Sequence, residues 1–178
     1  SGDEKKTLNL YKLAVKEDPK DIVRKVNLAR YLLDIRRLEQ CIKICEEIIK
    51  DDPRNFSAIY YRAVALFKDD HLSKALDGFE ECLLIYQYDI SSYVYKIRIL
   101  LKYCEYDKIE EIFKFLDDLA IGSEALTFYK TKIRYEREVI EFSKNPDDDE
   151  MDYSYYIDTY ENLLKKYKNN KSDIDDPM

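Results

Sequence analysis

Residues 56–89 read FSAIYYRAVALFKDDHLSKALDGFEECLLIYQYD, and this stretch decides the fold. Apolar residues recur in it every three or four positions, on both sides of a polar break at residues 68–71. This periodicity is typical of two amphipathic helices joined by a short turn. The whole chain has only three glycines and four prolines among 178 residues, too few for the many turns of an all-β fold.

The pattern repeats with a period of 34 residues. Pro19 and Pro53 are separated by this distance, and steps of 34 align six columns in which every residue is apolar. Because only 46% of the chain is apolar, chance agreement over so many columns is improbable, and internal repetition at this period indicates a stack of helix pairs. Three of the columns are Tyr11, Cys45, Phe79 and Phe113; Ala14, Ile48, Cys82 and Leu116; and Ala29, Ala63 and Ile97.

These columns match the tetratricopeptide repeat, which the sequence resembles over about residues 5–142. In 56–89, the family's signature positions hold Ala63, Leu66, Ala75 and Phe79. The resemblance implies an all-α fold: a right-handed superhelical solenoid of antiparallel helix pairs, with about four to five repeats. Small residues let two helices approach closely, and an aromatic residue fills the gap beside them.

The sequence departs from the family pattern at some positions. Gln87 and Ile121 stand where the family has proline, and Arg62 and Lys96 stand where leucine is common. We expect these departures to change packing details rather than the fold.

The repeat predicts the organisation of the first two thirds of the chain. A partial repeat covers 3–19 and contributes only a second helix, at 5–17. Full repeats follow at 22–55, 56–89 and 90–123. Because the repeat is entered part-way, after a Ser-Gly pair that resembles a tag scar, we expect a longer parent protein.

An atypical unit is predicted at 124–168, where the strict period ends. Its first helix covers 124–142, and an acidic, polar loop follows at 143–152. Residues 153–168 regain helical periodicity and suit a helix that caps the stack, and 169–178 read as a disordered tail. The apolar stripe of the capping helix consists of Tyr153, Tyr156, Ile157, Tyr160, Leu163, Leu164 and Tyr167.

Catalytic and metal chemistry find little support in the residues. His71 is the only histidine, and no nucleophile and orienting group can be assembled around it. Cys41 and Cys45 share a helix face but also occupy packing positions, which favours core packing over metal binding. The acids of 147–152 lack the alternation and the glycine of a calcium loop, so a solvated loop is the better interpretation. We predict no enzyme activity, no cofactor and no metal.

Charge and hydropathy exclude two classes of partner. The formal net charge is -7, whereas nucleic-acid binders carry a basic face. No window reaches the roughly 18 consecutive apolar residues of a membrane span. With no export signal, the sequence predicts a cytoplasmic protein with reduced thiols.

The concave groove of the predicted solenoid is the remaining candidate site. In the family, the first helix of each pair lines this groove at fixed positions, and the resemblance carries those positions onto this chain. They are mainly apolar and aromatic, with basic residues at the ninth position of three units, which favours a peptide or partner helix with apolar anchors and acidic residues. The predicted groove residues are Val26, Arg30, Tyr60, Val64, Phe67, Val94, Arg98, Leu101, Phe128, Lys132 and Tyr135.

One known binding mode of the family is disfavoured. A subclass holds the acidic C-terminal tails of chaperones in a clamp of two lysines, two asparagines and one arginine. None of the corresponding positions matches, because they hold Val26, Arg30, Tyr61, Ser91 and Tyr95.

Several interpretations of the whole chain remain open at this point. The leading one is a protein-protein interaction module from a larger scaffold or adaptor. The alternatives are a structural homo-oligomerisation module and a regulatory arm of a larger enzyme or receptor. The groove could also be filled by the chain's own terminal helix at 153–168.

Overall fold

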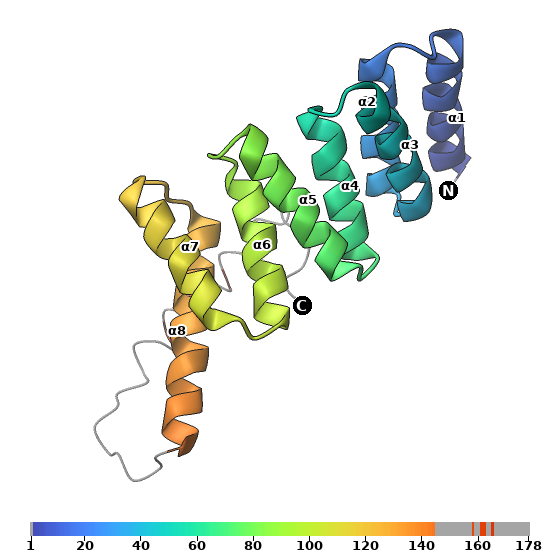
Figure 1. Cartoon of the computed structure of the whole chain (residues 1–178). Helices are drawn as coiled ribbons and strands as arrows, with labels where there is room; N and C mark the ends of the chain where they lie inside the picture. Colours follow the sequence, from blue (N-terminus) through green and yellow to red (C-terminus); the bar gives the residue numbers. More distant parts are fainter. Residues whose placement is uncertain (1, 145–157, 159–160, 163–164, 166–178) are drawn as a thin grey trace. The chain divides into compact units, whose positions relative to one another are not determined.

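The computed structural model describes residues 2–144, together with Asp158, Glu161, Asn162 and Lys165. These residues form α-helices and contain no strand, which confirms the predicted all-α class and its antiparallel helix pairs (Figure 1). The helices within 2–144 are α1 (Gly2–Glu17), α2 (Ile22–Asp34), α3 (Leu38–Asp51), α4 (Phe56–Lys68), α5 (Leu72–Ile85), α6 (Ile90–Lys102), α7 (Tyr106–Asp118) and α8 (Glu124–Lys144).

The chain divides into two compact units, each of which is described by itself. Unit 1 covers residues 1–103 and contains α1 to α6. Unit 2 covers 104–178, and its described helices of the repeat are α7 and α8.

Polar caps mark the 34-residue period at the start of every first helix. α2, α4, α6 and α8 each begin directly after a residue whose side chain accepts a hydrogen bond from the backbone N–H three residues later. Such a cap satisfies one of the backbone donors that a helix start leaves unpaired. The caps, with their acceptor distances, are Asp21 (3.1 Å), Asn55 (3.0 Å), Asp89 (2.8 Å) and Ser123 (3.2 Å).

The turn inside each helix pair repeats as well. Arg36, Asp70 and Cys104 are spaced by 34 residues and have φ of 56°, 60° and 56°. In the first two turns the next residue donates its N–H five residues back: Arg37 to the Leu32 carbonyl at 2.8 Å, and His71 to the Leu66 carbonyl at 2.9 Å. This is the left-handed helix ending that usually carries glycine, built here from larger residues.

Small residues let the helices of unit 1 approach closely. Gly78 on α5 faces Ala63 on α4, and a Cβ atom at position 78 would lie only 2.9 Å from the Cβ of Ala63. Cys41, Cys45 and Ala75 are also completely buried in this core, which confirms that the two cysteines are packing residues.

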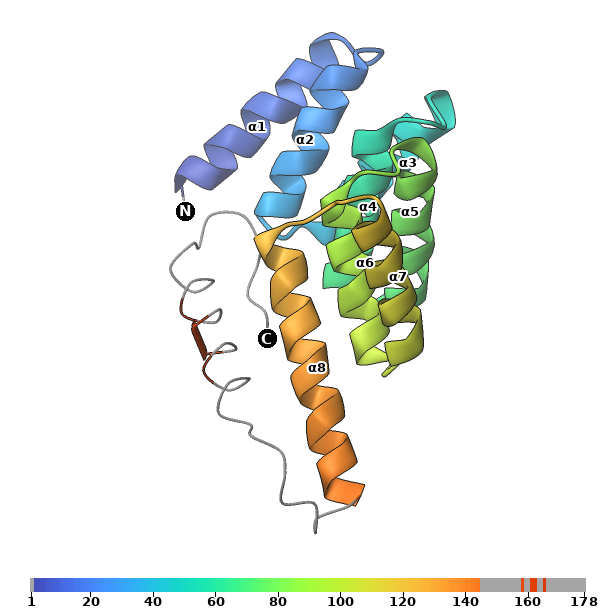
Figure 2. The same cartoon turned by 90° about the vertical axis from the view of Figure 1, so that its left-hand side faces the viewer.

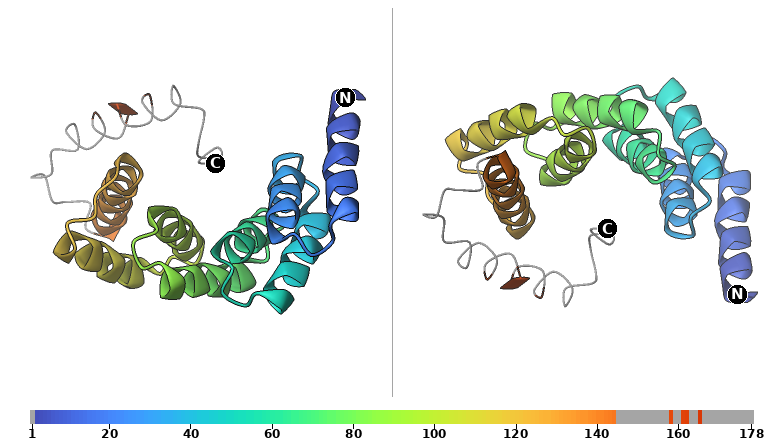
Figure 3. Two further views of the ribbon diagram at one scale, coloured as in Figure 1. Left: turned by 90° about the horizontal axis from the view of Figure 1, so that it is seen from above. Right: turned by 90° about the horizontal axis from the view of Figure 1, so that it is seen from below.

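Unit 1 has two helix layers. In two perpendicular views, α2, α4 and α6 lie on one side of the unit, and α3 and α5 lie on the other (Figures 2 and 3). We call the surface formed by α2, α4 and α6 the first-helix face. The side chains that the family places in its groove belong to this layer.

The helix boundaries correct the sequence prediction in two places. α1 begins at Gly2 instead of residue 5, so its first turn also includes Gly2, Asp3 and Glu4. α8 ends at Lys144 instead of 142, because the helical pattern of residues 124–142 continues through Ser143 and Lys144. The loop predicted at 143–152 was therefore wrong at its start, and residues 145–152 lie outside the described part of the chain.

Most of the predicted capping helix 153–168 and all of the predicted tail 169–178 also lie outside the described residues. The four described positions in 153–168 are helical and exposed. They fall at i, i+3, i+4 and i+7, the polar side of the predicted helix.

Candidate partner-binding face

A cluster of aromatic rings lies across α4, α5 and α6 of unit 1. Its centre is Tyr95, whose ring stacks on Phe79 at a centroid distance of 4.8 Å and an interplanar angle of 5°. Phe67 meets Tyr95 edge-on at 5.2 Å. Both geometries are favourable for aromatic pairs, and together they hold the Tyr95 ring from two sides.

Tyr60 extends this cluster along α4. Its ring lies 6.1 Å from Phe79, 6.2 Å from Tyr95 and 6.0 Å from Phe56. Burial, followed by the neighbouring Tyr95 hydroxyl, raises the pKa of Tyr60 above its usual range, so the phenol stays neutral. We call Phe56, Tyr60, Phe67, Phe79 and Tyr95 the aromatic cluster; all of them except Phe79 are only half-buried.

Arg98 on α6 covers part of the aromatic cluster with its guanidinium group. The Arg98 Cζ atom lies 4.8 Å from the centroid of Phe67 and 5.3 Å from that of Tyr95. Lys102, one turn further along α6, places its Nζ 5.6 Å from the Phe67 centroid and 3.1 Å from Asp70 Oδ1. Cations over ring faces are attracted by the ring quadrupole, so the rings help to hold both side chains.

A second cation, Arg30, lies on α2 of the same face. It is exposed, and its charge acts on Tyr61 of α4: burial raises the pKa of Tyr61, and Arg30 opposes this increase. The first-helix face therefore combines aromatic surface with positive charge from α2 and α6.

The structure places most of the predicted groove residues of unit 1 at its surface, but not all of them. Arg30 is exposed, and Val26, Tyr60, Phe67, Arg98 and Leu101 are half-buried. Val64 and Val94 have exposed fractions of only 3% and 4%, so the prediction that they line an open groove was wrong. For Val64 the reason is side-chain length: it occupies the same repeat position as Arg30 and Arg98, but a valine does not reach past its neighbours, whereas an arginine does. Side-chain length does not explain the burial of Val94, because Val26 at the equivalent repeat position is half-buried.

Unit 2 carries the remaining predicted residues. Phe128 on α8 is 1% exposed and contacts the ring of Tyr129 at 5.2 Å, so the prediction that it lines an open groove was wrong. Lys132 is half-buried and lies 3.8 Å from Glu136 Oε1 on the same helix. The Tyr135 side chain lies outside the described part of the structure.

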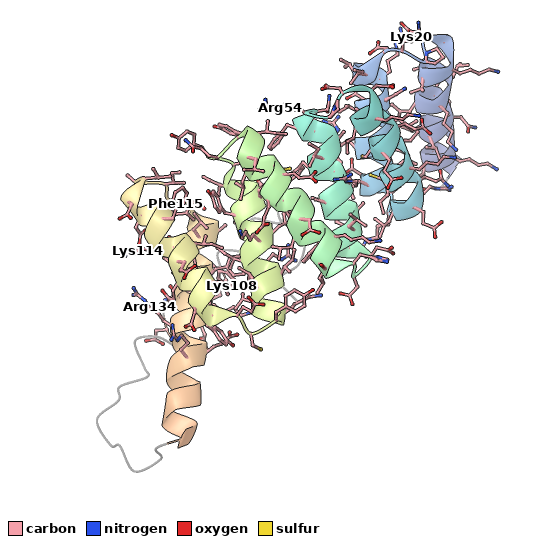
Figure 4. All side chains as sticks on the ribbon, in the orientation of Figure 1. Lys20, Arg54, Lys108, Lys114, Phe115 and Arg134 are labelled. Atoms are coloured by element: carbon pink, nitrogen blue, oxygen red, sulfur yellow. The ribbon has the colours of Figure 1, made fainter. Side chains whose placement is uncertain are left out.

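Other side chains of unit 2 are displayed in Figure 4, where Lys114 and Phe115 are labelled on α7 and Arg134 on α8. Phe115 is exposed despite its apolar ring.

Sequence reasoning did not assign the central ring of the aromatic cluster to the site. Tyr61 and Tyr95 are 34 residues apart and occupy the same repeat position, but we had considered them only as mismatched positions of the chaperone clamp. The column itself was the signal that could have identified them. What it could not show is that Tyr95 stacks on Phe79, which depends on how α5 and α6 pack.

The chemistry of the described residues offers contact surfaces instead of reactive groups. His71 is exposed at the start of α5, and its Nδ1 lies 3.0 Å from Asp69 Oδ2. The thiol of Cys41 and then burial raise the pKa of the Cys45 thiol, which therefore stays protonated. Within the described residues, no three histidine, cysteine or acidic side chains come together as metal ligands. None of the helices described is both long and apolar enough to cross a membrane.

Comparison with known proteins finds solved structures with a similar fold. No protein-family model matches the sequence, and no curated protein matches it. The chain is similar in fold to MamA. One crystal structure of MamA superimposes with a TM-score of 0.69 and 17% sequence identity, over 94% of this chain and 91% of that one.

A second structure gives a consistent result over a shorter range. MamA from Desulfovibrio magneticus RS-1, residues 41 to the end, matches with a TM-score of 0.60 and 16% identity over 67% of each chain. At this level of identity the comparison establishes the helical-repeat fold, and the site has to be argued from its own residues.

Proposed function

We propose that this chain is a protein-protein interaction module of a scaffold or adaptor, and that the first-helix face of unit 1 binds a segment of its partner. The observation that carries the proposal is the half-buried aromatic cluster with Arg98 on top of it. Tyrosine, phenylalanine and arginine are enriched where partners bind, and arginine and tyrosine carry much of the binding energy there.

The form of the surface favours a peptide or a helix over a small molecule. The accessible groups of the face come from three parallel elements, α2, α4 and α6: Arg30 is exposed, and Val26, Tyr60 and Leu101 are half-buried. A partner segment that crosses successive helices can place an apolar side chain on each. This is the same kind of partner that the sequence predicted, with apolar anchors and some acidic groups.

The test is capture of partners by the full chain from an extract of its source cells, followed by mass spectrometry. One variant reverses the charge of two cations on the face, Arg30→Glu with Arg98→Glu. Its matched control reverses two exposed cations of the opposite layer, Lys43→Glu with Lys74→Glu, so both variants change the net charge equally. Circular dichroism confirms that both remain folded.

We expect the face variant to lose the captured proteins and the control to retain them. If both variants capture the same proteins in the same amounts as the original chain, the first-helix face is not the binding site. If both lose them equally, the contacts are non-specific electrostatic ones.

A second function, self-association, is supported by a different element. Leu10 and Leu13 on α1 have exposed fractions of 59% and 53%, which is unusual for two leucines one turn apart. Self-association predicts a mass in light scattering that increases with concentration and returns to that of a single chain in the variant Leu10→Asp with Leu13→Asp. A constant mass over a hundredfold concentration range excludes it.

A further inference from the structure

Two aromatic rings of the first-helix face position the guanidinium group of Arg98. Its guanidinium lies over Phe67, with the carbon atom 4.8 Å from the ring centroid, and within 5.3 Å of the Tyr95 centroid. Tyr95 is itself held by its stack on Phe79. An arginine whose planar group rests on fixed rings loses little conformational freedom when it binds a ligand.

The charge of Arg98 is not compensated by an acid in the described part of the chain, unlike that of its neighbours. Arg62 on α4 lies 2.9 Å from Glu81, Lys96 on α6 lies 2.7 Å from Glu80, and Lys102 lies 3.1 Å from Asp70. The cations before and after Arg98 on the same helix thus each have a carboxylate, while Arg98 has only aromatic rings.

We infer that Arg98 determines the specificity of the first-helix face by binding a side-chain carboxylate of the partner, an aspartate or a glutamate, next to an apolar residue. This inference rests on the proposed function. The rings attract the guanidinium through their quadrupoles and do not pair with its N–H groups as a carboxylate does, so these groups can donate two parallel hydrogen bonds to a planar carboxylate. The apolar neighbour of that acid packs on the half-buried Phe67 and Tyr60.

The position of Arg98 favours a side-chain carboxylate over the free C-terminus of a peptide. Arg98 lies in the interior of α6, which runs from Ile90 to Lys102, so the free backbone N–H groups at the start of its own helix are not beside it to bind a chain end. The next cation along the helix, Lys102, already has Asp70 as its partner.

The first part of the test identifies a ligand with a defined probe. A phage-displayed library of random twelve-residue peptides is selected on the immobilised full chain, and the enriched peptides are synthesised with a fluorescent label. We expect the enriched peptides to share an acidic residue beside an aromatic or aliphatic one. Their binding to the full chain in solution is measured by fluorescence polarisation.

The second part of the test distinguishes the two parallel hydrogen bonds of a guanidinium from the effect of its positive charge alone. Arg98→Lys keeps the cation and its attraction to the rings but loses the two parallel donors, so we expect binding to weaken about ten- to hundredfold. Replacing the peptide's acid by its amide should weaken binding equally, and the two changes together should cost no more than either alone. Arg54→Lys, at the exposed turn between α3 and α4 (Figure 4), should leave binding unchanged.

Four results overturn the inference. The first is enrichment of peptides without an acidic residue, or binding to Arg98→Lys that stays within twofold of the original. In that case the face can still bind a partner, but through residues other than Arg98. The second is binding that depends on a free C-terminus, shown by its loss in amidated peptides. The third is binding that appears only after Asp147, Asp148 and Asp149 are replaced by asparagine, which identifies the chain's own acids as the occupant. The fourth is enrichment of no peptide at all, after which partner capture with the charge-reversed face decides the proposed function separately.

Discussion

The helix pairs α2/α3 and α4/α5 follow one another in unit 1 and share almost all of their backbone features. Their first helices have 13 residues and their second helices 14. Each pair begins after a side-chain cap, at Asp21 and Asn55, and turns through a left-handed residue, at Arg36 and Asp70. The side chains that fill this common backbone are quite different.

Three equivalent positions show the contrast. Ile44 in the first pair corresponds to Gly78 in the second, Leu28 corresponds to Arg62, and Arg30 corresponds to Val64. In the second pair Gly78 lies close to Ala63, and this pair contributes most of the aromatic cluster. The comparison teaches that caps and turns maintain the period, whereas the side chains between the helices and on the surface vary from pair to pair.

The largest expected effect comes from giving the second pair the residue of the first. Gly78→Ile introduces four carbon atoms where even one Cβ would lie 2.9 Å from Ala63. We expect a loss of about 3 kcal/mol in the free energy of unfolding, the upper range for overpacking a core. Urea unfolding followed by circular dichroism measures it. A loss below about 0.5 kcal/mol would show that α4 and α5 can move apart to accommodate the isoleucine, and that Gly78 does not set the contact.

A smaller effect isolates the steric contact itself. Gly78→Ala alone should destabilise by about 1 kcal/mol, since the clash with Ala63 exceeds the gain in helix propensity from alanine. In the background Ala63→Gly the opposing Cβ is absent, so the same Gly78→Ala change should become stabilising. This double-mutant cycle measures the contact directly, and equal effects of Gly78→Ala in both backgrounds would refute the close approach as its cause.

The side-chain cap of the second pair should contribute to stability. Asn55→Ala removes the acceptor for the Ala58 N–H and also the hydrogen bond that Asn55 Nδ2 donates to Asp52 Oδ2 at 3.0 Å. We expect a loss of about 1 kcal/mol in urea unfolding. The neighbouring exposed Arg54→Ala serves as the control and should change stability by less than about 0.5 kcal/mol. A cap effect no larger than that of the control would mean that the polar column does not help to maintain the period.

The fold could be predicted from the sequence because packing at a fixed spacing requires apolar residues at a fixed spacing. Columns such as Ala29, Ala63 and Ile97 are all completely buried. The capping residues Asp21, Asn55, Asp89 and Ser123 recur with the same period and would have located the start of every first helix. An argument from apolar residues alone does not use these polar positions. The ends of α1 and α8 were predicted less accurately, because the apolar columns contain no residue at 2–4 or at 143–144.

The candidate site could be predicted only in part. Assigning groove positions by repeat number treats Arg30, Val64 and Arg98 alike, although exposure depends on how far each side chain reaches. The placement of Arg98 over Phe67 also needs the packing of α4 against α6, which no spacing in the sequence specifies. The repeat positions predicted that α2, α4 and α6 form the face. Side-chain size and helix packing determine which groups are exposed on it.

The smallest expected effect tests whether the turns after the two pairs are interchangeable. The Asn55 N–H donates to the Asp52 carbonyl at 3.1 Å, and the Asp89 N–H donates to the Tyr86 carbonyl at 3.2 Å, with Pro53 and Gln87 at the second position of each turn. The residues before them are both extended, with φ and ψ of -135° and 87° at Asp52 and -137° and 92° at Tyr86, a conformation that a following proline accepts.

Gln87→Pro should therefore stabilise the chain by about 0.4–1 kcal/mol, because it restricts the unfolded state and fits the turn already present. The matched change in the first pair, Pro53→Gln, should destabilise by a similar amount. Both are measured by urea unfolding under the same conditions. If Gln87→Pro destabilises instead, the turn before α6 differs from the turn before α4 in a way that the backbone angles do not reveal, and the two pairs share less of their backbone than their caps suggest.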